Sequence, residues 1–299
     1  MPGGLRRETA VTGPLAILGP GVLGLSAARW AAECGVGVRL LGRDLEHAAR
    51  GRAEIERRWE AAVAKGRLDP GARAQARARL EVQAFGPEAL SDAEAFLEAV
   101  PEDAGAKIRA LAAAAAWGPP GLLMLSGTSA LPVSELAQGA SLSGRLLGFH
   151  LFVPVARMAV VELVVPDGTP EPLMDRARGL AGILGKRVAR VRDQAGFAAA
   201  RMALAQGLEA MRLLEAGVAS AEDLDALMTL GYGHPVGPLE LSDRVGLDLR
   251  LAIAEGIHRA TGDPAFQPPR LLQEKVARGE IGLPAGLGFY RWDVSGERA

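Results

Sequence analysis

The chain has 299 residues; 49% are hydrophobic and 4% aromatic, and its 34 basic and 35 acidic residues nearly cancel. This length allows about two domains, and the balanced charge lacks the basic excess of a nucleic-acid binder. A single cysteine excludes an intrachain disulfide framework and a CxxC metal or redox site. The sequence has neither an apolar run long enough for a membrane span nor a signal-peptide pattern, which predicts a cytoplasmic protein.

The first part of the chain has the pattern of a βαβ unit. Apolar residues 15–18 predict a strand, residues 22–33 an apolar helix and residues 38–41 a second strand. The stretch 44–84 is rich in Arg, Glu and Ala, with a break at Asp69-Pro70-Gly71. It predicts one or two amphipathic helices, more than an ordinary crossover needs.

Strands and helices continue to alternate up to about residue 191. Strands are expected at 95–100, 122–126, 146–149, 159–164 and 187–191, and helices at 104–116, 133–137 and 172–184. This alternation predicts a mostly parallel sheet covered on both faces. After Asp193 strand signals stop and only helices are expected. We therefore place one domain at 1–191 and a helical domain at 192–299.

A glycine motif opens the first helix. Gly19, Gly21 and Gly24 form a GxGxxG directly after the first strand. In this context Gly19 permits the tight turn, Gly21 lets the backbone approach a pyrophosphate, and Gly24 lets the helix and strand pack closely. The motif predicts a dinucleotide-binding, Rossmann-type domain with a doubly wound sheet, followed by an all-α domain.

The residue that would select between NAD and NADP is not the usual one. An acid normally ends the second strand and binds the ribose hydroxyls, but this position is Gly42, followed by Arg43 and Asp44. Arg43 has the charge to pair with a 2′-phosphate, which favours NADP. Asp44 can still reach the ribose, and Arg43 is equally interpreted as an adenine-stacking or a solvated arginine, so NAD and NADP both remain open.

Three polar residues stand where a Rossmann enzyme places its substrate. Ser129 follows one predicted strand, His150 ends another, and Glu162 lies within an apolar strand. A buried carboxylate needs a partner, and a histidine fixed by it can take a hydroxyl proton as a hydride leaves. On chemistry alone, a structural histidine explains His150 as well as a catalytic one.

Several motifs, in order along the chain, are similar to those of the L-3-hydroxyacyl-CoA dehydrogenase family, which includes bacterial 3-hydroxybutyryl-CoA dehydrogenases. The resemblance runs from about residue 17 to residue 293. Its most specific segments are SGTSALP (126–132), GFHLFVP (148–154), VVEL (160–163), DQAGF (193–197), LLEAGVASAEDLD (213–225), GYGHPVGPLEL (231–241) and GLGFY (286–290).

The resemblance implies roles for these residues. His150 would be the catalytic acid/base, Glu162 its orienting carboxylate and Ser129 a hydrogen-bonding partner of the substrate oxygen, while Glu102 and Lys107 match positions that line the cofactor site. The family's region corresponding to 44–84 approaches the CoA nucleotide, although these helices are also explained as solvated faces. The resemblance also implies an acyl-CoA substrate and a homodimer formed by the helical domain. No metal is expected.

Two family asparagines are missing. The residue three after the histidine is Val153, and the residue before Arg201 is Ala200. Losing such polar partners weakens transition-state stabilisation.

From the resemblance we expect interconversion of a short-chain L-3-hydroxyacyl-CoA and its 3-ketoacyl-CoA. The missing asparagines leave two alternatives: a dehydrogenase of a free hydroxy acid such as gulonate or carnitine, or a weakly active dinucleotide-binding protein.

Overall fold

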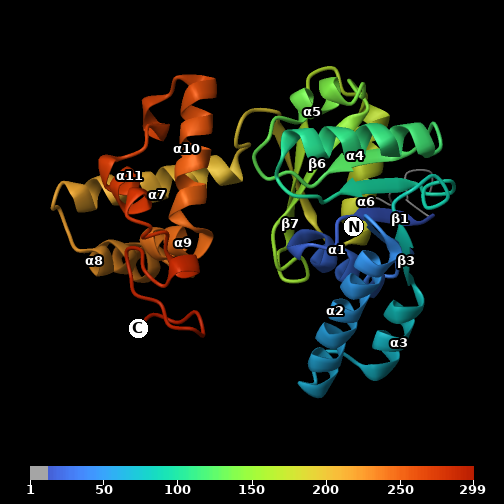
Figure 1. Cartoon of the computed structure of the whole chain (residues 1–299), viewed down its shortest axis with the longest axis horizontal. Helices are drawn as coiled ribbons and strands as arrows, with labels where there is room; N and C mark the ends of the chain where they lie inside the picture. Colours follow the sequence, from blue (N-terminus) through green and yellow to red (C-terminus); the bar gives the residue numbers. More distant parts are fainter. Residues whose placement is uncertain (1–12) are drawn as a thin grey trace, which may run out of the picture. The chain divides into compact units, whose positions relative to one another are not determined.

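The computed structural model describes residues 13–299, and the chain divides into two compact units (Figure 1). One unit ends at Gln194 and the other runs from Ala195 to Ala299. The division thus falls three residues after the predicted boundary at 191. Among the described residues, no helix combines the length and apolarity that crossing a bilayer requires.

The first unit contains one eight-stranded sheet in the order β3-β2-β1-β4-β5-β6-β7-β8. All neighbouring strands are parallel except β6 and β7, which are antiparallel. The predicted fold class is confirmed. The strands are β1 (Leu15–Leu18), β2 (Val38–Gly42), β3 (Leu80–Ala84), β4 (Ala95–Glu98), β5 (Leu123–Ser126), β6 (Leu146–Leu151), β7 (Val160–Val165) and β8 (Arg187–Arg192).

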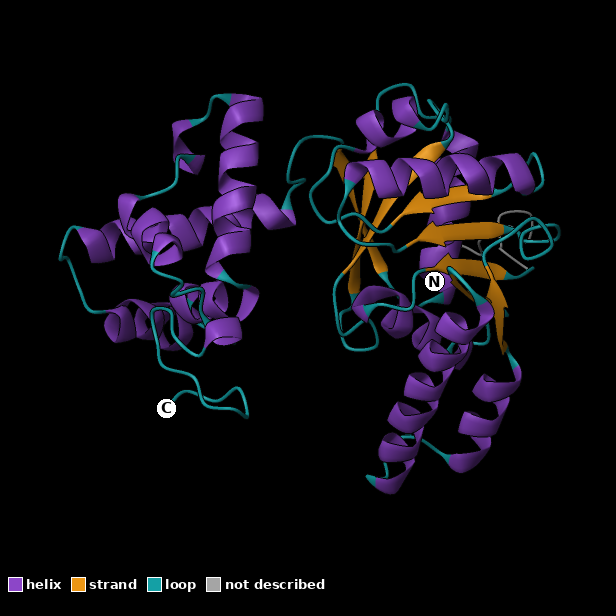
Figure 2. Cartoon of the chain, viewed as in Figure 1, coloured by secondary structure: helices purple, strands orange, loops and turns teal. Residues whose placement is uncertain are grey.

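Helices cover both faces of this sheet (Figure 2). One face packs on α1, α2, α3 and α6 through a large apolar cluster that includes the odd-numbered side chains of β1, β4 and β5. Because side chains alternate across a strand, the even-numbered ones face α4 and α5. The helices of this unit are α1 (Val22–Glu33), α2 (Leu45–Ala64), α3 (Pro70–Ala78), α4 (Ala104–Trp117), α5 (Val133–Gly139) and α6 (Glu171–Ile183).

The stretch 44–84 contains the predicted helices, with the break at Asp69, but its last five residues form a strand that was not predicted. It forms α2 and α3, which lie side by side and project from the sheet (Figure 1), and then the edge strand β3. Leu80 is buried and Val82 half-buried, and both pair in parallel register with β2. Hydrogen bonding to the edge of β2 and the burial of Leu80 explain the strand.

The second unit is helical, as predicted. It consists of α7 (Ala199–Glu215), α8 (Ala221–Ala226), the π-helix η2 (Leu227–Gly231), α9 (Pro238–Val245), α10 (Leu247–Thr261), the 3₁₀ turn η3 (Pro264–Phe266), α11 (Arg270–Ala277) and the 3₁₀ turn η4 (Leu283–Ala285). These elements share their own apolar core, which includes Leu208, Met211 and Leu239.

Strand order reverses direction between β1 and β4, because the chain adds β2 and β3 on one side and later strands on the other. In open sheets of this kind, ligands bind at the carboxyl ends of the strands beside such a switch point. The segments that follow β1, β4 and β5 meet there, and they carry most of the predicted site residues.

Candidate active site

The glycine turn after β1 has the geometry that a pyrophosphate requires. Gly19 has φ +106°, and a Cβ there would lie 2.5 Å from the Ala99 carbonyl oxygen. A Cβ at Gly24 would lie 1.9 Å from the Gly19 carbonyl oxygen, so α1 packs on this turn only with glycine. A Cβ at Gly21 would meet nothing within 4 Å. The open space at Gly21, at the N-terminus of α1, fits phosphates approaching its amides.

His150 and Glu162 are brought together by the one antiparallel pairing in the sheet. They are register partners in β6 and β7, and His150 Nδ1 lies 2.6 Å from Glu162 Oε2. Glu162 is 3% exposed and His150 8%, and the Phe152 ring lies 4.7 Å from the imidazole centroid. A buried carboxylate at this distance accepts a hydrogen bond from Nδ1–H of the neutral ring. Nε2 is then the basic nitrogen.

A buried ionic network lies at the ends of β4 and β5. Lys107 Nζ, on α4, lies 2.9 Å from Glu98 Oε1 and 3.1 Å from Glu102 Oε2. Glu98 also accepts hydrogen bonds from the Val100 amide at 2.7 Å and from Ser126 Oγ at 2.7 Å. Sequence reasoning found Lys107 and Glu102 but missed Glu98. Its signal was available, because a glutamate ending an apolar strand requires a partner just as Glu162 does.

Glu102 connects this network to Ser129. Its Oε1 accepts hydrogen bonds from Thr128 Oγ1 at 2.6 Å, the Ser129 amide at 2.9 Å and the Ala130 amide at 3.1 Å. Burial alone would raise the pKa of Glu102, but Lys107 and these hydrogen bonds outweigh it and lower the pKa. The ionised carboxylate thereby fixes the backbone that carries the exposed Ser129.

One hollow lies between the glycine turn and the network of Lys107, Glu102 and Ser129. It measures about 420 Å³, and its lining includes Gly19, Gly21, Glu102, Lys107 and Ser129. The other four predicted site residues, Gly24, Arg43, His150 and Glu162, are not in its lining. Arg43 lies on the β2–α2 turn with its side chain 76% exposed. His47 lines the hollow too, and sequence reasoning missed it because a histidine in a charged helix carries no distinctive signal.

A second hollow, of about 570 Å³, lies beside α1, α2 and the loop between β6 and β7. Basic side chains dominate its charged lining, which consists of Arg29, Arg58, Lys65, Arg67, Arg157 and Glu33. The loop that contributes to it continues from β6, the strand that carries His150. The arrangement suits a ligand with several negative charges.

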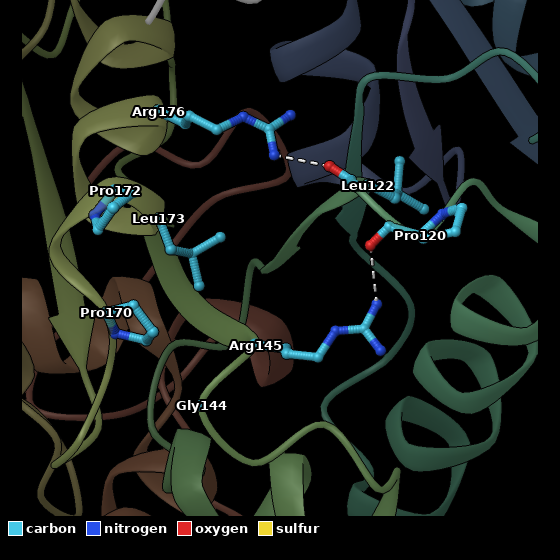
Figure 3. A pocket seen from close by; sticks show the side chains of 9 residues that line it. Pro120, Leu122, Gly144, Arg145, Pro170, Pro172, Leu173 and Arg176 are labelled. Atoms are coloured by element: carbon cyan, nitrogen blue, oxygen red, sulfur yellow. Dashed lines mark hydrogen bonds between the residues drawn. The ribbon is translucent and has the colours of Figure 1, made fainter.

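A third hollow lies at the opposite ends of the strands, where β5 and β6 begin (Figure 3). Arg145 donates to the Pro120 carbonyl, and Arg176 donates to the carbonyls of Gly121 and Glu94. Both guanidinium groups therefore hold backbone in place. This hollow shares no residue with the two described above.

Known proteins resemble both halves of the chain. The family model described as 3-hydroxyacyl-CoA dehydrogenase, NAD binding domain, matches residues 14–194, and the model of the family's C-terminal domain matches residues 196–292. A 3-hydroxybutyryl-CoA dehydrogenase of Mycobacterium tuberculosis is 34% identical over 280 residues, which cover 92% of this chain and 97% of the relative. A probable 3-hydroxybutyryl-CoA dehydrogenase of Bacillus subtilis is 32% identical over 277 residues, covering 93% and 96%.

A solved structure agrees with these matches. The crystal structure of (S)-3-hydroxybutyryl-CoA dehydrogenase from Ralstonia eutropha is similar with a TM-score of 0.90 and 29% identity, covering 95% of this chain and all of that one. Because family models match both units in order, this chain belongs to the 3-hydroxyacyl-CoA dehydrogenase family, with residues 14–194 as its NAD-binding domain.

Proposed function

We propose that the protein interconverts a short-chain L-3-hydroxyacyl-CoA and the corresponding 3-ketoacyl-CoA, with His150 as the acid/base. The observation that carries this proposal is the buried pair of His150 Nδ1 and Glu162 Oε2 at 2.6 Å, in a chain of this family. Bound NAD(H) supplies or accepts the hydride at the substrate's C3. The protein's own residues must then hold the C3 oxygen and move its proton.

His150 moves that proton. With Nδ1–H donating to Glu162, the neutral ring can take the hydroxyl proton at Nε2 as the alcohol is oxidised, and it returns the proton in the reverse direction. The imidazolium formed during oxidation is stabilised by the buried Glu162 carboxylate, because opposite charges attract strongly where water is excluded. Glu162 itself orients the ring.

Ser129 is proposed to donate a hydrogen bond to the substrate oxygen. Its backbone is held by Glu102, which accepts the amide hydrogens of Ser129 and Ala130. A group fixed in advance contributes more to catalysis than one that must be ordered during the reaction. We assign Glu102 and Lys107 to this positioning and to the lining of the cofactor hollow.

CoA is proposed to bind in the second hollow, beside α2, which is a cationic hollow because most of its charged lining is basic. The CoA nucleotide carries a diphosphate and a 3′-phosphate, and guanidinium groups pair well with both. Arg58 and Lys65 on α2 and Arg157 on the loop after β6 line this hollow. The loop connects the hollow to the strand of His150, as a thioester with a long CoA arm requires.

Assembly and location complete the proposal. Large apolar side chains are exposed on the helical unit at Leu227, Leu230 and Tyr232, and burying them against a second copy would give a homodimer. We place this enzyme in the cytoplasm.

A second substrate class has one observation in its favour. Val153 stands where the family usually has asparagine, and its side chain is 43% exposed on the loop after β6. An apolar side chain there cannot donate to a substrate oxygen, so the pocket differs from the family's usual one, and a free hydroxy acid is the alternative substrate. Comparing acetoacetyl-CoA with acetoacetate separates the two classes.

The deciding experiment follows NADH oxidation with each of these substrates, using wild type and His150→Gln. We expect turnover of the thioester by wild type and a loss of about 10²–10⁴-fold in kcat for the variant, with NADH binding retained. Turnover of acetoacetate alone would favour the free acid, and turnover of neither would favour a binding protein. A variant within a few-fold of wild type would remove His150 from its role.

A further inference from the structure

The β2–α2 turn lacks the carboxylate that normally selects against a 2′-phosphate. At Gly42, a Cβ would lie 2.6 Å from the Ala48 amide nitrogen and 2.7 Å from the Asp44 carbonyl oxygen. The first turn of α2 therefore packs directly against this glycine. An acidic side chain, which would bind the ribose hydroxyls and repel a 2′-phosphate, has no room here.

The neighbouring carboxylate, Asp44, already has partners. It is the N-cap of α2, and its Oδ1 accepts the His47 amide hydrogen at 2.6 Å. Its Oδ2 lies 3.3 Å from Arg43 Nε. The His47 amide, followed by the Arg43 guanidinium, lowers the pKa of Asp44. The charge of Asp44 is thus offset locally, and its ion pair with Arg43 is exposed and weak.

His47 has a polar atom without a partner. Its ring lines the hollow that contains Gly19 and Gly21, yet Nδ1 is buried and has no hydrogen-bond partner among residues 13–299. Leaving such an atom unpaired is costly. Because Nδ1 has no hydrogen-bond partner there, a rotation about the Cβ–Cγ bond that presents an N–H group to an acceptor in the hollow would satisfy the ring. Arg43 begins the same turn and adds an exposed guanidinium.

We propose that Arg43 and His47 bind the 2′-phosphate of NADP(H), so that the protein takes this dinucleotide as well as NAD(H). The guanidinium and imidazole donate to phosphate oxygens, and no acidic side chain at residue 42 opposes them. This inference deepens the proposed function at its cofactor-binding end, and it rests on that function only for dinucleotide binding.

The test measures the Kd of NADPH and of NADH by calorimetry, because the two differ only in the 2′-phosphate. It uses the full chain as wild type, Arg43→Ala and His47→Gln. We expect wild type to bind NADPH at least as tightly as NADH. Each substitution should raise the Kd of NADPH about tenfold, as the loss of a charge-assisted hydrogen bond predicts. The Kd of NADH should change less than threefold.

Arg50→Ala is the matched control, because Arg50 is an exposed arginine on α2 that pairs with Glu46. It should leave both affinities unchanged, and melting temperatures should show that every variant is folded. The inference is overturned if wild type binds NADPH at least tenfold more weakly than NADH, or if Arg43→Ala and His47→Gln affect both cofactors equally. Failure of the proposed function looks different: both cofactors bind, and neither is oxidised with acetoacetyl-CoA.

Discussion

Lys107 shows how single residues support the candidate site. Its side chain is 1% exposed and forms ion pairs with Glu98 and Glu102. An ammonium or a carboxylate taken out of water costs several kcal/mol unless it is paired. Glu98 is completely buried, so its charge depends on Lys107 directly.

Replacing Lys107 with Met should therefore destabilise the protein by about 3–5 kcal/mol, because it leaves the Glu98 carboxylate buried without its cation. Urea unfolding at neutral pH measures this loss. Arg109→Met is the control, since Arg109 is exposed on the same helix. A loss for Lys107→Met no larger than that of the control would show that Glu98 does not need Lys107.

The same variant has a pH signature. Because the pKa of Glu102 is lowered in the folded protein, the stability it contributes is complete above its unfolded pKa of about 4.5 and is lost as the pH falls through the lowered value. The stability gap between wild type and Lys107→Met should therefore narrow in acid.

Among single residues, the sequence predicted which polar side chains belong to the candidate site but not all of the contacts that they make. The pairing of His150 with Glu162 could be predicted, because a glutamate inside an apolar strand demands a partner and a histidine ended a nearby strand. The role of Glu102 in holding the Ser129 and Ala130 amides could not. Those contacts bring residues 27 and 28 positions apart together through loop conformations that no sequence period encodes.

Helix α2 carries one side of the proposed CoA site. Arg57 and Arg58 are adjacent on it, and both form ion pairs with Glu54. Only Arg58 lines the cationic hollow. Comparing substitutions of these two arginines therefore distinguishes a contribution to ligand binding from a contribution to the stability of the helix.

We predict that Arg58→Ala raises the KM for acetoacetyl-CoA about tenfold, as expected when one charged hydrogen bond to a phosphate is lost. The value of kcat should stay unchanged, because the contact is the same in the ground and transition states. Steady-state kinetics with Arg57→Ala alongside provides the comparison. Equal effects of the two substitutions would place CoA elsewhere.

The elements themselves were predicted well where their apolar period was clear. Strand β3 was missed because LEVQA follows a long run of Arg, Glu and Ala without a turn signal, and only Leu80 of it is buried. The antiparallel direction of β7 was also beyond the sequence. It depends on a short connection from β6, and the spacing of apolar residues is the same for both directions.

For the whole molecule, the expected homodimer is the feature that needs a test. We predict that Leu230→Glu, which places a charge where an 87% exposed leucine stands, converts a dimer into a monomer, because an unpaired charge in an apolar interface is costly. Light scattering during size exclusion measures the mass. Leu45→Glu changes an exposed leucine on α2 and should leave the dimer intact; a dimeric Leu230→Glu would exclude this surface.

The order of the two units was predictable because the alternation of strand and helix patterns stops near residue 193, after which only helix patterns follow. The family resemblance was carried by short motifs spread over both units, and the family models match both. Burial in a second copy leaves no such periodic signal, so the dimer rests on resemblance and on exposed apolar side chains.

The packing at Gly42 limits how this protein can evolve. A glycine codon is one nucleotide change from an aspartate codon, so the acid typical of NAD-selective turns is within reach genetically. The backbone of Asp44 and Ala48 leaves no space for it, so that mutation would be removed by selection as a folding defect. An acidic side chain at residue 42 is therefore accessible only after the turn has first been rebuilt.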